Sequence, residues 1–191
     1  AATGKLLAGH RLQFTEVVTG MRVDDFTQPI KLKPTSDKFD LPQLAGLEGK
    51  PVLVELAGSW CSTCKSSAPF LVELYREYRP RGMEIVTLLY EFTNDKAYNA
   101  EQAARFKRDY GATWKVIPVD GEFEDLAEVI PRGLADLDPA GFPIALFLAA
   151  DRSLVALHAG FPSPDAKADF QKVAAEYRKH IEAMLARSKK P

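Results

Sequence analysis

The sequence predicts an α/β fold in which a mixed central sheet is flanked by helices. Residues 51–56 and 83–89 are short, nearly all-apolar runs, as expected of strands buried on both faces, and a helical pattern of apolar residues separates them over 61–79. Two strands joined by a helix in this way are parallel. Residues 144–149 and 154–159 flank a tight turn and predict an antiparallel hairpin, so the sheet is mixed.

The other elements of this domain follow from their boundary signals. Residues 100–110 form an amphipathic pattern, with Asn99 as a candidate cap and Gly111 as the stop, and predict a helix. Residues 115–119 predict a third strand. A helical turn or two is expected over 122–130.

The closing helix of the chain is expected directly after Ser163 and Pro164. Serine is a favoured cap, and proline is well tolerated in the first turn of a helix. The apolar pattern predicts that this helix runs to about residue 186.

The chain divides into an extension and one main domain. In residues 1–33, apolar and polar residues alternate over 12–18, and a second short strand is expected at 30–32, so we expect a β-hairpin packed on the domain. Residues 34–191 are expected to form the domain itself, with a helical insertion at about 90–113.

The overall composition excludes several classes of partner. The chain has 191 residues, of which 25 are basic and 26 acidic, and this balance gives no reason to expect nucleic acid or an anionic membrane as a partner. Its longest apolar runs are too short to span a bilayer. The chain begins without Met, and we interpret it as processed, which is compatible with a removed export signal or membrane anchor.

The only two cysteines, Cys61 and Cys64, lie three residues apart where the first strand gives way to the helix. This spacing at a helix start brings two sulfur atoms within bonding reach, and the positive end of the helix favours a thiolate at Cys61. The thiolate is the attacking species in thiol–disulfide exchange, so Cys61 is the candidate nucleophile and Cys64 the resolving thiol. The alternatives are a static disulfide or half of a zinc site, but the histidines are distant in sequence, so we expect no metal.

Two further residues carry a functional signal. Glu55 is an acid in an otherwise apolar strand, six residues before Cys61, where it could lie beneath the dithiol and accept the proton of Cys64. The alternative is a glutamate that faces solvent or forms a salt bridge. Pro143 opens the strand that begins at Ile144, and a cis bond after Phe142 would explain a proline there; the alternative is a trans turn proline.

Together these features resemble the thioredoxin superfamily over about residues 52–185. They are the acid in the strand, the sequence Trp-Cys-Ser-Thr-Cys-Lys over 60–65, the helix proline Pro69 and the proline before the late hairpin. The N-terminal extension and the insertion resemble the TlpA-like branch of thiol–disulfide oxidoreductases, which are redoxin or AhpC-TSA-like. Members of that branch are exported or membrane-anchored bacterial reductases, some of which serve cytochrome c maturation.

The resemblance assigns a role to each matching position. It implies a redox-active disulfide, no other cofactor, and a groove beside the disulfide in which the partner binds. The roles it implies in the reaction are Cys61 as nucleophile, Cys64 as resolving thiol, Glu55 as buried acid, Pro69 as helix kink and Pro143 as cis-proline. The residues it implies as contacts of the partner are Trp60, Ser62, Thr63 and Phe142.

The sequence departs from the branch pattern in three places. Ser62 and Thr63 stand where the branch often has a proline, and this dipeptide tunes the redox potential. Phe142 replaces a small or β-branched residue in the partner groove. Residues 65–67 supply no acid after the second cysteine, which leaves Glu55 as the local candidate.

The predicted function is therefore exchange of disulfides with protein partners, in the reducing direction and in a periplasmic or other extracytoplasmic compartment. The implied partners are protein thiols or disulfides and an upstream electron donor, and we expect a monomer. One alternative is a metal-binding or non-catalytic interaction module that uses the dithiol to hold a soft metal. Another is a peroxiredoxin-like peroxidase, but Gly58 stands where that chemistry needs a threonine three residues before the cysteine.

Overall fold

A computed structural model describes residue 39 and residues 41–119, 142–163 and 165–188. The hairpin expected in residues 1–33 and the helical turns expected over 122–130 lie outside the described residues.

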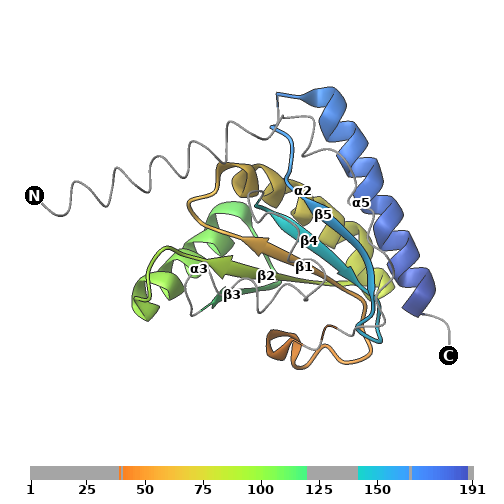
Figure 1. Ribbon diagram of the computed structural model, residues 1–191, viewed down its shortest axis with the longest axis horizontal. Coiled ribbons are helices and arrows are strands. Elements are labelled where there is room, and N and C mark those ends of the chain that lie inside the picture. The colour runs from red at the N-terminus through yellow and green to blue at the C-terminus, as the bar shows by residue number, and fades with distance from the viewer. Residues whose placement is uncertain (1–38, 40, 120–141, 164, 189–191) are drawn as a thin grey trace, which may run out of the picture.

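The described strands form one mixed sheet in the order β3-β2-β1-β4-β5 (Figure 1). Strands β1 and β2 are parallel, as are β2 and β3, whereas β4 runs antiparallel to both β1 and β5. The predicted mixed sheet is therefore confirmed. The strands are β1 (Val52–Ala57), β2 (Glu84–Tyr90), β3 (Lys115–Val119), β4 (Ile144–Leu148) and β5 (Leu154–Ala159).

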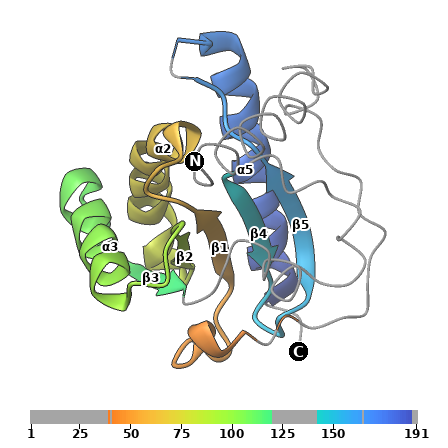
Figure 2. The ribbon, with the colours of Figure 1, turned by 60° about the vertical axis from the view of Figure 1, so that its left-hand side comes forward.

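Within the described residues, three α-helices flank this sheet. Helix α2 (Ser62–Tyr78) joins β1 to β2, and α3 (Lys96–Tyr110) joins β2 to β3 and lies beside α2 (Figures 1 and 2). Helix α5 (Lys167–Ser188) packs on β4 and β5. Two short 3-10 helices, η2 (Pro42–Leu44) and η3 (Arg79–Arg81), precede β1 and follow α2.

The start of α3 corrects the sequence prediction. The helix begins at Lys96, and its cap is Asp95, whose Oδ1 accepts the backbone N–H groups of Ala97 and Tyr98 at 3.0 and 3.1 Å. Asn99 lies inside the first turn, where its side-chain amide donates to the carbonyl of Thr93 at 2.8 Å. Asparagine and aspartate are both good caps, so local propensity does not distinguish Asn99 from Asp95, which the sequence analysis did not consider. In the structure Asp95 forms the capping hydrogen bonds, and the Asn99 amide is bound to the nearby carbonyl of Thr93.

The predicted end of α3 at Gly111 is confirmed, whereas the predicted start of α5 directly after Ser163 is wrong. Gly111 ends α3 in the left-handed conformation, with φ of 67°, as predicted. Helix α5, however, begins at Lys167 and not directly after Ser163. The carbonyl of Ser163 accepts the N–H of Ala166 at 3.0 Å, so a turn precedes the helix.

The sheet buries hydrophobic side chains on both faces. Side chains of β1, β2 and β4 form one cluster with α2 and α5, in which Leu53, Ile85 and Phe147 are fully or almost fully buried. The opposite-facing side chains of the same strands form a second cluster, which continues to the start of α2. Because β1 is buried along its whole length, a polar side chain on it must find its partners inside the protein.

Candidate active site

Helix α2 begins at the cysteine pair. Strand β1 ends at Ala57, and Cys61 is the N-cap of α2, with an extended backbone (φ −81°, ψ 115°). The structure therefore places Cys61 at the positive end of a 17-residue helix. Ser62 is the first residue of α2 and is exposed, and Pro69 lies inside the helix, which continues past it to Tyr78.

The two sulfur atoms are joined. Cys61 and Cys64 form a disulfide, with their Cα atoms 5.3 Å apart. The backbone N–H of Cys64 points at Cys61 Sγ at 3.1 Å. Cys64 is fully buried, whereas Cys61 keeps 6% of its surface exposed. Both cysteines are buried, and Cys61 is the one that keeps some accessible surface.

The loop before Cys61 is tied to the end of β2. The backbone N–H and the hydroxyl of Ser59 donate to the two carboxylate oxygens of Glu91, at 3.1 and 2.8 Å. The indole of Trp60 donates to the carbonyl of Tyr90 at 2.9 Å. Gly58 allows this arrangement, because a Cβ there would lie 2.5 Å from the Trp60 ring.

The peptide between Phe142 and Pro143 is cis, as predicted, and it lies against the start of α2. Thr63 Oγ1 donates to the carbonyl of Phe142 at 2.8 Å and lies 3.2 Å from Cys61 Sγ. The Trp60 ring packs edge-on against Phe142, with centroids 5.7 Å apart. The structure thus brings together the predicted residues Trp60, Cys61, Thr63, Phe142 and Pro143.

Glu55 is buried among hydroxyl groups. Only 2% of its surface is exposed. Ser67 donates to one carboxylate oxygen at 2.8 Å and Thr87 to the other at 3.1 Å. Burial raises the pKa of Glu55 to about 7, against the lowering effect of these two hydrogen bonds. The surface or salt-bridged alternative for Glu55 is therefore wrong.

Ser67 connects Glu55 to the second cysteine. Its Oγ lies 2.9 Å from the carbonyl oxygen of Cys64 as well as 2.8 Å from Glu55 Oε1. A hydroxyl has one hydrogen, so Ser67 serves one of these acceptors at a time when the carboxyl is ionised. When Glu55 is protonated, the carboxyl can donate to Ser67, which can then donate to the Cys64 carbonyl.

Sequence reasoning missed several residues of this site. Ser67 was considered only as a position without an acid. Thr87 was not identified as a partner of Glu55, nor Trp114 as a partner of Thr87. Glu91 did leave a signal, since it is an acid directly after a buried apolar strand, as Glu55 is an acid within one. Its partner Ser59 lies 32 residues away in sequence, and only the fold pairs the two.

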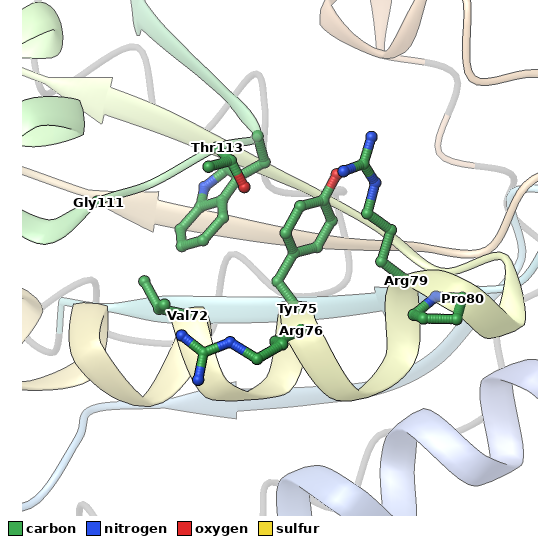
Figure 3. Close-up of a pocket in the computed structure, with 8 residues that line it drawn as sticks. Val72, Tyr75, Arg76, Arg79, Pro80, Gly111 and Thr113 are labelled. Carbon is green, nitrogen blue, oxygen red and sulfur yellow. The ribbon is translucent and has the colours of Figure 1, made fainter.

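The part of the chain that the structure describes contains no group of three side chains able to hold a metal ion. It also contains no helix with the length and hydrophobicity needed to cross a bilayer. A pocket of about 330 Å³ lies along the second half of α2, beyond the dithiol, and Figure 3 shows its wall. The residues that line it are Val72, Tyr75, Arg76, Arg79, Pro80, Gly111, Thr113 and Trp114.

Residues 19–127, more than half of the chain, match the family model described as Redoxin. The thiol–disulfide oxidoreductase ResA of Oceanobacillus iheyensis is 34% identical over 114 residues, which are 58% of this chain and 56% of that protein. ResA of Bacillus subtilis is 28% identical over 90 residues, 47% of each protein. The chain thus spans about half the length of the curated relatives it matches.

Solved structures show the fold. A thiol:disulfide interchange protein of the thioredoxin family from Chlorobium tepidum superposes with a TM-score of 0.53 at 18% identity, over 81% of this chain and 99% of the other. A DsbF homologue from Corynebacterium diphtheriae gives a TM-score of 0.52 at 22% identity, over 73% of this chain and 75% of the other. The predicted thioredoxin-like fold is confirmed.

Replacing Glu55 with glutamine should change how stability depends on pH. Because the folded-state pKa is raised to about 7, the wild type loses stability as pH rises from about 4.5 to 7. Glu55→Gln removes that loss, so at pH 8 the oxidised variant should be more stable by up to about 3 kcal/mol, and the difference should vanish at pH 4. Urea unfolding of both proteins at pH 4, 6 and 8 measures this.

Glu84→Gln is the matched control of opposite sign. Burial raises the pKa of Glu84, but its hydrogen bonds from Lys50 and Tyr75 outweigh burial and lower the pKa overall. This variant should therefore be less stable than the wild type at pH 8. A pH-independent effect of Glu55→Gln would contradict the assignment of a buried, titrating carboxyl.

Glu91→Ala should weaken the loop that precedes Cys61. It leaves the N–H and hydroxyl of Ser59 without their protein acceptors. Because Ser59 is half-buried, we expect a loss near the lower end of the roughly 1–3 kcal/mol that an unpaired buried donor costs. Glu91→Gln keeps one carbonyl oxygen and should lose less. Thermal unfolding of the oxidised proteins tests the order wild type, Gln, Ala; an alanine variant as stable as the wild type would show that this contact does not hold the loop.

Proposed function

The chain belongs to the Redoxin family, within the TlpA-like branch of the thioredoxin superfamily, and from that premise we propose that it is a thiol–disulfide oxidoreductase acting on protein thiols and disulfides. The names of its relatives support this class of enzyme. The single observation that carries the proposal is the Cys61–Cys64 disulfide at the N-cap of α2, in which Cys61 is the cysteine that keeps some accessible surface.

In the first step, the Cys61 thiolate of the reduced protein attacks one sulfur of a partner disulfide. A mixed disulfide forms, and the other partner sulfur leaves as a thiolate. The Cys64 N–H, which lies 3.1 Å from Cys61 Sγ, and the positive end of α2 both stabilise the negative charge on that sulfur before attack.

In the second step, Cys64 resolves the mixed disulfide. Its thiol must first lose a proton, and the Glu55 carboxylate takes it. A base with a pKa of about 7 is suited to accept a proton near neutral pH and to release it afterwards. The Cys64 thiolate then attacks Cys61 Sγ, the partner leaves with both sulfurs reduced, and the Cys61–Cys64 disulfide forms. An upstream dithiol donor must reduce this disulfide again.

The partner chain would bind beside the cis peptide. Trp60, Thr63 and Phe142 surround the accessible sulfur, and Phe92, which is 65% exposed, stacks on the Trp60 ring with centroids 4.4 Å apart. This aromatic rim suits a partner segment with apolar side chains next to its cysteine. Ser62, exposed at the first position of α2, extends the same rim.

We place the activity in the reducing direction and in an extracytoplasmic compartment. The dipeptide between the cysteines, Ser62-Thr63, contains no histidine to stabilise the thiolate further, and a less stabilised thiolate makes a better reductant. Two cysteines in the whole chain, both in one disulfide, suit an oxidising compartment. Reduction of a disulfide between cysteines of an apocytochrome c is one such task.

Cysteine variants test the exchange itself. Cys61→Ser should abolish reduction of a model protein disulfide, a loss of at least about 1000-fold, because the attacking atom is gone. Cys64→Ser should trap the mixed disulfide with the partner, visible on a non-reducing gel. Ser66→Ala, which removes an exposed hydroxyl from the same helix, should retain activity. Exchange that persists in Cys61→Ser would overturn the proposal.

The redox potential tests the direction. Equilibration of the Cys61–Cys64 pair in a glutathione buffer series, with the thiols counted by alkylation, should give a potential more negative than that of glutathione. A potential more positive than that of glutathione would make the protein an oxidant and would contradict the reducing role, while leaving the exchange chemistry intact.

A further inference from the structure

A line of hydrogen bonds runs from the surface pocket to the buried carboxyl. The indole N–H of Trp114 donates to Thr87 Oγ1 at 3.0 Å, and Thr87 Oγ1 donates to Glu55 Oε2 at 3.1 Å. Thr87 is fully buried, and only 3% of Trp114 is exposed. Trp114 also forms part of the pocket wall drawn in Figure 3. The chain of contacts therefore links the pocket between α2 and residues 111–114 to the central strand β1.

The strand register explains why these groups meet. Glu55 on β1 pairs with Thr87 on β2, which pairs with Val116 on β3, so the three side chains form one row on one face of the sheet. Trp114 lies at a bend directly before β3, and its side chain packs in the same hydrophobic cluster as Leu53 and Ile85. These two residues precede Glu55 and Thr87 by two positions on their strands and so face the same side of the sheet. The indole thus reaches the row from its outer end.

The chemistry of the three groups fixes which one donates and which one accepts in each hydrogen bond. An indole N–H can only donate, so the Thr87 oxygen is the acceptor and its single hydrogen remains for Glu55. In a buried setting, a hydroxyl that already accepts one hydrogen bond is a stronger donor in the next. Removal of the indole N–H would leave Thr87 free to turn its hydroxyl toward another acceptor.

We infer that Trp114 is a positioning residue of the active site, which acts through Thr87 to orient the Glu55 carboxyl and to favour its ionised form. This inference rests on the proposed role of Glu55 as the base for Cys64. Hydrogen bonds from Thr87 and Ser67 lower the pKa of Glu55 against the effect of burial, so the line sets the pH at which the base is available. Ser67 supplies the second donor from α2.

The other titratable groups that face Glu55 do not change protonation state near neutral pH in the oxidised protein. Cys64 on α2 is in the disulfide. Tyr177 on α5 has a pKa raised by burial and by the charge of Glu55. His158 on β5 lies in the same row beyond Ala145 of β4, and burial, together with the charge of His180, lowers its pKa to about 4. A titration near pH 7 in this region therefore reports on Glu55.

The test is an NMR titration of the oxidised protein, with no exchange partner present. The labelled side-chain carboxyl carbon of Glu55 should titrate near pH 7, and the indole N–H resonance of Trp114 should move with the same midpoint. Trp60 is the internal control among the two tryptophans of the chain, because its indole donates to the carbonyl of Tyr90. A Trp114 resonance that does not follow the Glu55 midpoint would overturn the inference.

Variants then separate the indole from the packing around it. Trp114→Phe and Thr87→Val should each raise the Glu55 midpoint by roughly half a unit or more, whereas Thr87→Ser, which keeps the hydroxyl, should not. Tyr75→Phe is the matched control, since Tyr75 packs on Trp114 with centroids 5.4 Å apart and its hydroxyl bonds Glu84 instead. An unchanged midpoint in Trp114→Phe, or an equal shift in Tyr75→Phe, would contradict the role of the indole.

Exchange kinetics complete the test. In Trp114→Phe the pH profile of the exchange rate should shift upward by the amount of the Glu55 midpoint. If Cys61→Ser shows the proposed function to be wrong, the NMR titration still tests the coupling between Trp114 and Glu55, because it is measured without disulfide exchange. If exchange is confirmed but the profile of Trp114→Phe does not move, only the positioning role is overturned.

Discussion

The site depends on one interaction, the contact of the Cys64 backbone N–H with the sulfur of Cys61 at the first turn of α2. A helix N-terminus has backbone donors without partners in the helix, and here one of them is directed at the sulfur that has to carry negative charge. The same turn buries Cys64 and leaves Cys61 partly open. One local geometry therefore supplies the close sulfur pair, the stabilised thiolate and the difference in access between the two cysteines.

Rigidity around that turn comes from three separate parts of the sheet. Strand β1 leads into it, the end of β2 binds Ser59 and Trp60 through Glu91 and Tyr90, and the peptide before β4 accepts the hydroxyl of Thr63. None of these partners is close in sequence. The dithiol is held by strands that are buried along all or nearly all of their length, which fixes its position in the fold.

The Glu55 carboxyl, which Ser67 links to the carbonyl of Cys64, is balanced between two opposed effects. Burial in a hydrophobic strand penalises the charged form of Glu55, while the hydroxyls of Ser67 and Thr87 favour it, and the pKa of about 7 is the outcome. Such a carboxyl lowers stability at alkaline pH, and a protein retains that cost where function requires a proton acceptor that is poised near neutral pH. The indole N–H of Trp114 donates to Thr87, so the hydrogen bonds to Glu55 continue to the segment directly before β3.

The sequence by itself determined the features that depend on local chemistry. The spacing of Cys61 and Cys64, the apolar runs of β1 and β2, the stop at Gly111 and the cis bond before Pro143 were all readable, because each needs only neighbouring residues or a period in the chain. The choice of Asp95 over Asn99 as the cap of α3 could not be read from the sequence, since the two residues have similar local propensity to cap a helix. The partners of Glu55 and of Ser59 were decided only by tertiary structure. Ser67, Thr87, Trp114 and Glu91 lie on other elements, and strand register and helix packing bring them together.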